Sequence, residues 1–249
     1  MAEYEIFPNP PIAEAVIDIR TILPDSISIT DIDYLCQKVE DRFPKKSAKN
    51  FFGGKIKVPG NENSDFGFVQ SESGIIGYIL ISEDESEIVQ FRMDGFTYNK
   101  LRPYQTWNLF YEKGHELWEL YLKAVKPSEI RRIGLRYINH IKLPLPFNDF
   151  NEYILTNPRI AEGLVQGISS FFMRFVMADP ELKCHAVVTQ TIEPHQDDTL
   201  PFIFDIDVFK EKDYTTNTDQ IWIDFKDLKK FKNDIFFKSI TDKTKELFK

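Results

Sequence analysis

The chain has 249 residues, 42% of them apolar and 28% charged, and its formal net charge is −8. This length allows one large domain or two small ones, and the composition argues against a disordered chain and, with only two cysteines, against a disulfide scaffold. No apolar run approaches the roughly 18 residues that cross a membrane, and the acidic balance disfavours a protein whose whole surface binds nucleic acid.

The beginning of the chain predicts a strand followed by a helix. Residues Ala15 to Ile19 alternate strictly between apolar and polar, which is typical of a strand with one polar face. Thr30, with Asp33 three positions later, marks a helix start, and Pro44 ends that helix. The Lys-, Gly- and Asn-rich residues 44–65 indicate a connecting segment.

Several strands and a long helix complete the first half. We expect strands at 66–70, 75–81 and 88–96, with the acidic run Glu83 to Glu87 as a solvent-exposed turn between two of them. Residues 104–125 carry an aromatic stripe at helical spacing. Such a stripe is more typical of a buried helix face than of a ligand-binding box.

The second half predicts similar elements in a similar order. A strand at Arg131 to Ile141 ends before Pro144, and a short helical piece follows at 150–155. Three strands and a final Lys-rich helix complete the chain, with expected bounds of 164–177, 184–192, 202–209 and 224–248.

The two halves also align with each other. Phe91 to Phe96 matches Phe204 to Phe209, and the apolar stripe from Trp107 to Leu122 matches that from Phe225 to Ile240. One half alone leaves a sheet edge and an apolar face unpaired, and two halves joined edge to edge cover both. A chance match between two α+β segments is the alternative. We expect one duplicated domain over residues 1–249, with repeats at about 10–127 and 128–249.

The predicted fold class is therefore α+β. Two strand-helix-strands-helix repeats form one curved antiparallel sheet with the long helices on one face. This arrangement resembles the saddle of the TATA-binding-protein fold and related tandem modules. The resemblance is one of topology, so it implies a fold and no function.

Two sequence motifs resemble a known family. Pro10 to Ile19 reads PPIAEAVIDI, and Gly134 to Asn139 reads GLRYIN. Together they resemble a sporadically distributed family of uncharacterised, mostly bacterial proteins of similar length, and the likeness spans most of the chain. The resemblance implies no settled activity. A patchy distribution suits an accessory or defence-related role.

Motifs of catalysis and of cofactor binding are absent from the sequence. It contains no P-loop, no G-x-G-x-x-G, no H-E-x-x-H and no G-x-S-x-G, so we expect no cofactor, and a non-catalytic protein is favoured. The four histidines are scattered, and none is spaced from another His or Cys as metal ligands are.

Three aspartates are the weak candidates for a metal site. Asp205 and Asp207 share one face of a strand, and Asp94 lies at the matching position of the first half. Carboxylates in this arrangement suit a divalent cation. The alternative is that they form the polar outer face of a half-exposed sheet.

Charged residues on the two repeat-leading strands are the stronger candidates for a site. Asp18 and Arg20 lie on the first strand, and Arg132, Arg136 and His140 lie on the second. In the saddle arrangement these strands are adjacent, antiparallel and central. The charges then either pair with one another or bind an anion, since a guanidinium recognises carboxylate or phosphate with two parallel hydrogen bonds.

Three functions remain open after this reading. The first is a non-catalytic binding module for a small anionic ligand or a protein partner. The second is a metal-dependent phosphoesterase or nuclease that uses the three aspartates. The third is a nucleic-acid-binding saddle, which the net charge disfavours without excluding. A homodimer is also compatible, because the outer strands of an open sheet remain edges.

The N-terminus and the cysteines bear on the compartment. Met1 to Glu5 is acidic and lacks the basic and apolar segments of a signal peptide. Cys36 and Cys184 each lie within an apolar pattern, as buried reduced thiols do. We expect a cytoplasmic protein with no membrane partner.

Overall fold

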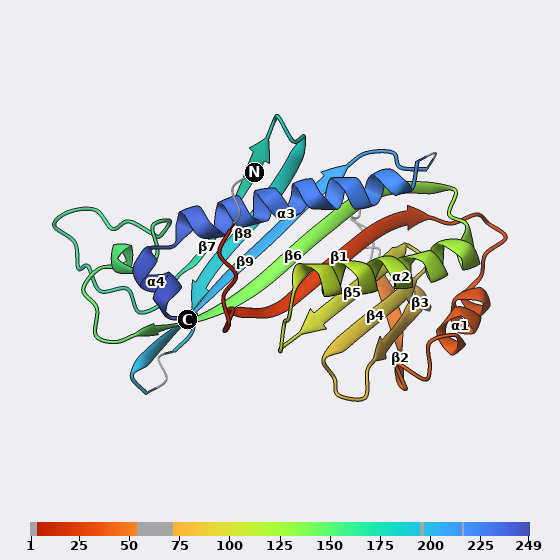
Figure 1. Cartoon of the computed structure of the whole chain (residues 1–249), viewed down its shortest axis with the longest axis horizontal. Coiled ribbons are helices and arrows are strands. Elements are labelled where there is room, and N and C mark those ends of the chain that lie inside the picture. Colours follow the sequence, from red (N-terminus) through yellow and green to blue (C-terminus); the bar gives the residue numbers. More distant parts are fainter. Residues whose placement is uncertain (1–3, 54–71, 195–196, 216) are drawn as a thin grey trace, which may run out of the picture.

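The computed structural model describes residues 4–53, 72–194, 197–215 and 217–249. They form an α+β fold built on one antiparallel sheet of nine strands, with the helices α1, α2 and α3 in front of it in Figure 1. In chain order the elements are β1 (Ile12–Ile22), α1 (Ile29–Gln37), β2 (Lys45–Gly53), β3 (Glu72–Ile81), β4 (Glu87–Arg92), β5 (Gly95–Leu101), α2 (Trp107–Val125), β6 (Glu129–Pro144), the 3-10 turn η1 (Phe150–Glu152), β7 (Phe172–Asp179), β8 (Cys184–Ile192), β9 (Thr199–Glu211), α3 (Asp219–Ser239) and α4 (Asp242–Glu246).

The strands β1 and β6, with which the two predicted repeats begin, lie at the centre of the sheet. The strand order is β2-β3-β4-β5-β1-β6-β9-β8-β7, so β1 and β6 are neighbours and each begins a run of strands toward one edge. They pair antiparallel, with Asp18 opposite Gly134 and Arg20 opposite Arg132. The expectation that these strands are adjacent, antiparallel and central is confirmed.

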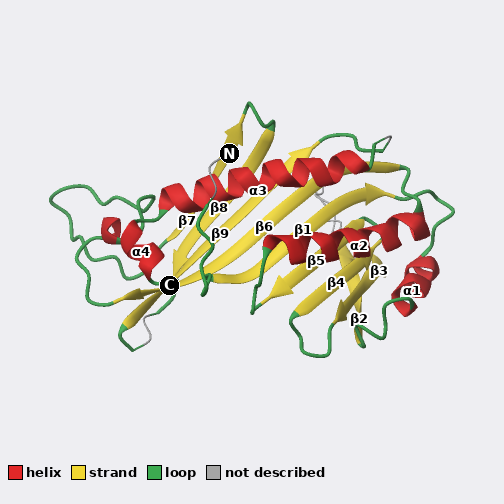
Figure 2. Ribbon diagram, viewed as in Figure 1, coloured by secondary structure: helices red, strands yellow, loops and turns green. Residues whose placement is uncertain are grey.

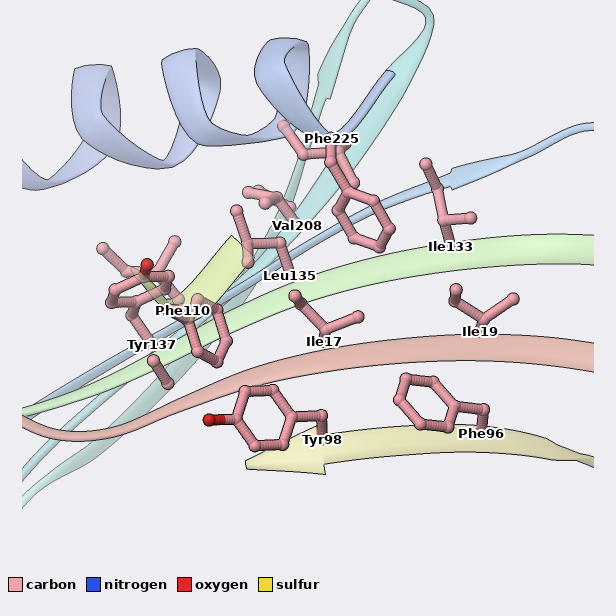
Figure 3. Close-up of a cluster of buried hydrophobic side chains, with 14 of the residues drawn as sticks. Ile17, Ile19, Phe96, Tyr98, Phe110, Ile133, Leu135, Tyr137, Val208 and Phe225 are labelled. Atoms are coloured by element: carbon pink, nitrogen blue, oxygen red, sulfur yellow. The ribbon is translucent and has the colours of Figure 1, made fainter. Parts of the chain in front are cut away.

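The core lies between the sheet and the helices. Alternate side chains of the central strands point toward the helices, because successive residues of a strand face opposite sides. Figure 3 shows strand side chains from β1, β5, β6 and β9 meeting Phe110 of α2 and Phe225 of α3. The buried strand residues in that view include Ile17, Ile19, Phe96, Tyr98, Ile133, Leu135, Tyr137 and Val208.

The aromatic stripe predicted for the long helix is confirmed as core. Phe110, Leu117, Trp118 and Tyr121 of α2 are all buried. The helix begins at Trp107, where the Thr106 side chain accepts a hydrogen bond from a backbone N–H, rather than at residue 104.

The predicted strand at 88–96 is wrong, because two strands occupy this region. β4 ends at Arg92, Met93 and Asp94 form a tight turn, and β5 begins at Gly95. Gly95 has φ +148, a conformation that residues with a side chain rarely adopt. The apolar pattern continues through this turn, so periodicity alone did not reveal it.

The predicted connection at 44–65 is also corrected. Residues 45–53 form the edge strand β2, paired with β3 alone among the described residues. The polar composition of these residues favoured a connecting segment in the sequence prediction, although lysines are also typical of an edge strand. The rest of that segment and the strand predicted at 66–70 lie outside the described residues.

Three further bounds differ from the prediction. The strand predicted at 164–177 is present only as β7, and Leu164 and Val165 before it are exposed. The final helix is two helices, because Ile240 takes an extended backbone and Thr241 caps α4. The first helix is capped at Ser28, whose backbone N–H and hydroxyl both donate to the Asp31 carboxylate, rather than at Thr30.

The prediction of two buried, reduced cysteines is confirmed. Cys36 and Cys184 are free and buried, and burial raises the pKa of each thiol to about 11. Among the described residues, no helix has the length and apolar character needed to cross a membrane.

We predict that Gly95→Ala destabilises the fold strongly. A Cβ at this position would overlap the carbonyl oxygen of Ile19 on β1, and the positive φ adds backbone strain. We expect a loss of about 3 kcal/mol in the free energy of unfolding, measured by chemical denaturation. The control is Gly74→Ala, where a Cβ has no neighbour within 4 Å. Equal losses in the two variants would contradict this account of the turn.

Candidate functional site

The sheet face opposite the helices carries the charged residues of the two central strands. Ala15, Ile17 and Ile19 of β1 point into the core, so Asp18 and Arg20 point to the other face. The same alternation brings Arg132 and Arg136 of β6 to that face. The register of β1 and β6 then places all four side chains on neighbouring positions.

A cavity of about 450 Å³ lies on this helix-free face. Its volume is in the range of small-molecule binding pockets, although its lining is far more polar than usual. Most of the lining side chains are charged or carry amide or hydroxyl groups. The lining residues are Glu14, Val16, Asp18, Arg20, Lys49, Gln90, Arg92, Thr97, Asn99, Arg132, Gly134, Arg136 and Asp207.

The carboxylate of Asp18 lies at the centre of this lining and binds three guanidinium groups. Arg20 donates from Nε at 2.9 Å, Arg92 from Nη2 at 3.2 Å and Arg132 from Nη1 at 3.3 Å. The Thr97 hydroxyl donates to it as well, at 2.9 Å. We call these five residues the Asp18 network. The Asp18 side chain is only 16% exposed, so the solvent screens these ion pairs less than it would at the surface.

Arg92 and Thr97 are the members of the network that the sequence did not predict. The Arg92 side chain is 3% exposed, and it donates from Nε to Asp94 at 2.7 Å and from Nη1 to Thr97. Hydrogen bonds of this kind are required for a buried charge. The signal was present as Arg-x-Asp-Gly, which is a charged pair across a tight turn, but the turn itself was not recognised.

Two aspartates of β9 bind the arginines of β6. Arg136 makes two parallel hydrogen bonds to Asp205, at 2.8 and 2.6 Å. Arg132 Nη2 lies 3.6 Å from Asp207, and its guanidinium carbon lies 4.4 Å from the ring centre of Phe209. Burial raises the pKa of Asp207 above its ordinary value, despite the opposing charge of Arg132.

Lys49 extends the positive charge to the edge strand β2. It lies opposite Gly77 of β3, and Lys49 Nζ donates to Gln90 Oε1 at 2.7 Å. Among the described residues, no carboxylate oxygen lies within 4.0 Å of this amine. Burial and the neighbouring Arg92 charge lower the pKa of Lys49. It lies in residues 44–65, for which the sequence predicts a connecting segment.

One buried amide atom of the lining has no hydrogen-bond partner. The Asn99 side chain donates to Glu14, while its Oδ1 accepts from no described residue. A buried acceptor of this kind is costly unless a donor satisfies it.

The three aspartates predicted as a weak metal site are not brought together. Asp94 lies in the turn after β4, whereas Asp205 and Asp207 lie on β9, and β5, β1 and β6 separate these strands. Each is paired with arginine instead. In the part of the chain that the structure describes, no group of three His, Cys, Asp or Glu side chains is arranged to hold a metal ion.

His140 also differs from the other predicted site residues. It is exposed on β6 opposite Ile203 and does not line the cavity, whereas Asp18, Arg20, Arg132 and Arg136 do. The sequence posed two alternatives for these arginines, mutual pairing or a binding pocket. The pairing is confirmed, and Arg20, Arg132 and Arg136 also line the cavity, while anion binding stays a prediction.

Comparison with known proteins adds no relative. The chain matches no family model, no curated protein and no solved structure.

We predict different effects on stability for two substitutions that each replace a carboxylate of this site with an uncharged amide. Asp18→Asn leaves three guanidiniums without their shared carboxylate, and we expect a loss of about 3 kcal/mol in the free energy of unfolding. The folded-state pKa of Asp207 is raised, so its charged form opposes folding above that pKa and the penalty disappears as the pH falls through it. Asp207→Asn should therefore leave stability unchanged or slightly increased at pH 7.

Urea denaturation of both variants at pH 7 measures this difference. If Asp207→Asn lowers the free energy of unfolding as much as Asp18→Asn does, Asp18 is not the carboxylate on which the network depends.

Proposed function

We propose that this protein is a non-catalytic binding module that holds a small anionic ligand in the cavity on the helix-free face. The observation that carries the proposal is the convergence of four guanidiniums and one amine on a single cavity. These groups belong to Arg20, Lys49, Arg92, Arg132 and Arg136, from four different strands.

The internal pairing of the arginines supports ligand binding as well as stability. A guanidinium has five N–H donors. Arg20 engages Asp18 through Nε and Asp94 through Nη1, and Arg136 engages Asp205 through Nε and Nη2. Each side chain is about half exposed, so N–H groups remain for a ligand. The carboxylates fix the orientation of these guanidinium groups before a ligand binds, which lowers the entropic cost of binding.

Charge and hydrogen bonding indicate the class of ligand. The lining has five cations against the carboxylates of Glu14, Asp18 and Asp207, which gives 5 − 3 = +2. Asp94 and Asp205 bind Arg20, Arg92 and Arg136 from outside the lining and bring the sum to 5 − 5 = 0. A phosphate or a dicarboxylate therefore matches the arginine N–H donors, since both accept paired hydrogen bonds from arginine. The unpaired Asn99 Oδ1 favours a ligand that also carries a donor, such as a hydroxyl or an amine.

The other two candidate functions receive less support. A metal-dependent phosphoesterase needs carboxylates free to bind a cation, and Asp94, Asp205 and Asp207 are engaged by arginines. A nucleic-acid-binding saddle needs a continuous row of cations for the phosphate backbone. Here Glu14 and these aspartates interrupt that row.

We further propose that the two halves of the sheet arose by duplication in a saddle related to the TATA-binding-protein arrangement. The strand order supports this, because β1-β5-β4-β3 on one side corresponds to β6-β9-β8-β7 on the other, and α2 corresponds to α3. In this account the cavity lies across the boundary between the repeats. Both repeats then contribute to one binding site.

We predict that inorganic phosphate and a small dicarboxylate raise the melting temperature of the protein. At about 100 times its Kd, a ligand stabilises the native state by roughly 2.7 kcal/mol. Lys49→Gln and Arg136→Gln should each weaken binding about tenfold in calorimetric titration, because each removes a charge-assisted hydrogen bond.

Arg131→Gln is the matched control for this prediction. Arg131 lies on β6 beside the site residues but is exposed, pairs with Glu129 and does not line the cavity. Its substitution should leave the affinity within twofold of the original, a change of about 0.4 kcal/mol. The proposal fails if neither anion stabilises the protein, or if the control weakens binding as much as the two site variants.

A further inference from the structure

The strand β7 is an apolar sheet edge that no described residue covers. It lies at the end of the strand order, beyond β8, as Figure 2 shows. Phe172 is 70% exposed and Val176 is 58% exposed, both on the helix-free face. Met173, Phe175 and Met177 point to the other face and are incompletely buried. The outer backbone groups of such a strand are a template for pairing with another strand.

The opposite edge of the sheet is protected in a way that β7 is not. The described part of β2 carries Lys45, Lys46 and Lys49, and lysines on an edge strand discourage pairing with another chain. β7 has the sequence FMRFVMAD, with one cation and one anion in eight residues. The two edges of the sheet therefore differ in charge: the lysines of β2 discourage pairing with another strand, and the apolar β7 has no such protection.

We propose that β7 pairs antiparallel with β7 of a second copy of this chain, which joins the two sheets into one across a two-fold axis. An antiparallel contact between identical edges requires this axis to be perpendicular to the sheet. The helix-covered faces of the two copies then lie on the same side. The contact closes on itself, so it forms a dimer and not a filament.

The two-fold axis restricts the register and identifies a favourable one. Directly opposite residues must point to the same face, so their numbers must sum to an even value. With Phe175 opposite Phe175 of the second copy, Met173 lies opposite Met177. On the other face Phe172 lies opposite Ala178, and Arg174 lies opposite Val176. All six side chains on the helix side of this pairing are thus apolar, and no like charges face each other.

A second copy fits this edge better than the protein's other exposed edge does. Pairing of β7 with β2 would be head-to-tail and would leave an edge open at each end of the assembly. It would also place apolar side chains against the lysine-bearing strand. In the segment before β7, Leu164 and Val165 are exposed as well.

Two substitutions at one position test the pairing and its register. The two-fold axis creates two equivalent pairs between residue 176 of one copy and Arg174 of the other. Val176→Lys makes both pairs repulsive, whereas Val176→Glu makes both attractive. Sedimentation equilibrium of the full chain should show a dimer for the unmodified protein. It should show a shift of about tenfold or more toward monomer for Val176→Lys and a retained dimer for Val176→Glu. Circular dichroism checks that both variants remain folded.

A cysteine on the proposed axis gives an independent test. Phe175→Cys should form an intermolecular disulfide under mild oxidation, because opposite Cβ atoms in an antiparallel pair lie about 4.5–5.5 Å apart. The native Cys36 and Cys184 are buried, so the unmodified protein is the control. A monomer at all concentrations overturns the proposal. So does a dimer that Val176→Lys leaves intact, since that dimer would use another surface, and a Phe175→Cys variant that stays uncrosslinked.

Discussion

The Asp18 carboxylate is the constraint on which the rest of this structure depends. It lies in the middle of a nine-stranded sheet, nearly covered, and three guanidiniums from β4, β1 and β6 bind it. A carboxylate in this position is tolerated only when its partners are placed accurately. Two features therefore fix the register of the central strands: the apolar side chains that pack against the helices, and the ion pairs on the opposite face of the sheet. A slip of one residue would place Asp18 in the core.

The asymmetry of the two sheet faces connects the fold with the proposed function. The helices α1, α2 and α3 all cover one face, as Figure 1 shows, so the other face must remain polar. Its charges are paired with one another, and the side chains of Arg20 and Arg136 are still about half exposed. The same network that satisfies the sheet thus arranges the groups that would bind an anion. In the proposed function, stability and anion binding therefore depend on one set of side chains.

Much of this arrangement could be predicted from local patterns. Strict alternation identified the inward residues of β1 and β9, and the aromatic stripe identified the buried face of α2. The placement of Arg20 beside Arg132 followed from making the two repeat-leading strands neighbours. Pairing of that kind is a long-range property, and only the apparent repetition of elements suggested it.

The missed features share a physical cause. Arg92 reaches the site because of glycines, which carry no periodic signal. Gly95 allows the turn that places Arg92 beside Asp94, and a Cβ at Gly77 would meet Arg92 itself. Lys49 reaches the site from β2, whose strand character the sequence did not reveal. The polar strand β2 was likewise hidden, because the lysines that suit an edge also suit a loop. The metal hypothesis failed because it considered the aspartates without the arginines that neutralise them.

The most direct test of the central claim is the response of individual arginine side chains to an anion. The Nε–H signals of a ¹⁵N-labelled protein can be followed by NMR while inorganic phosphate is added. The account predicts that the signals of Arg20 and Arg136 shift and saturate together. Arg42, which pairs with Glu116 of α2 away from the cavity, should not respond. If no arginine signal of the cavity shifts, or if Arg42 shifts equally, the charged face is a structural network and not a binding site.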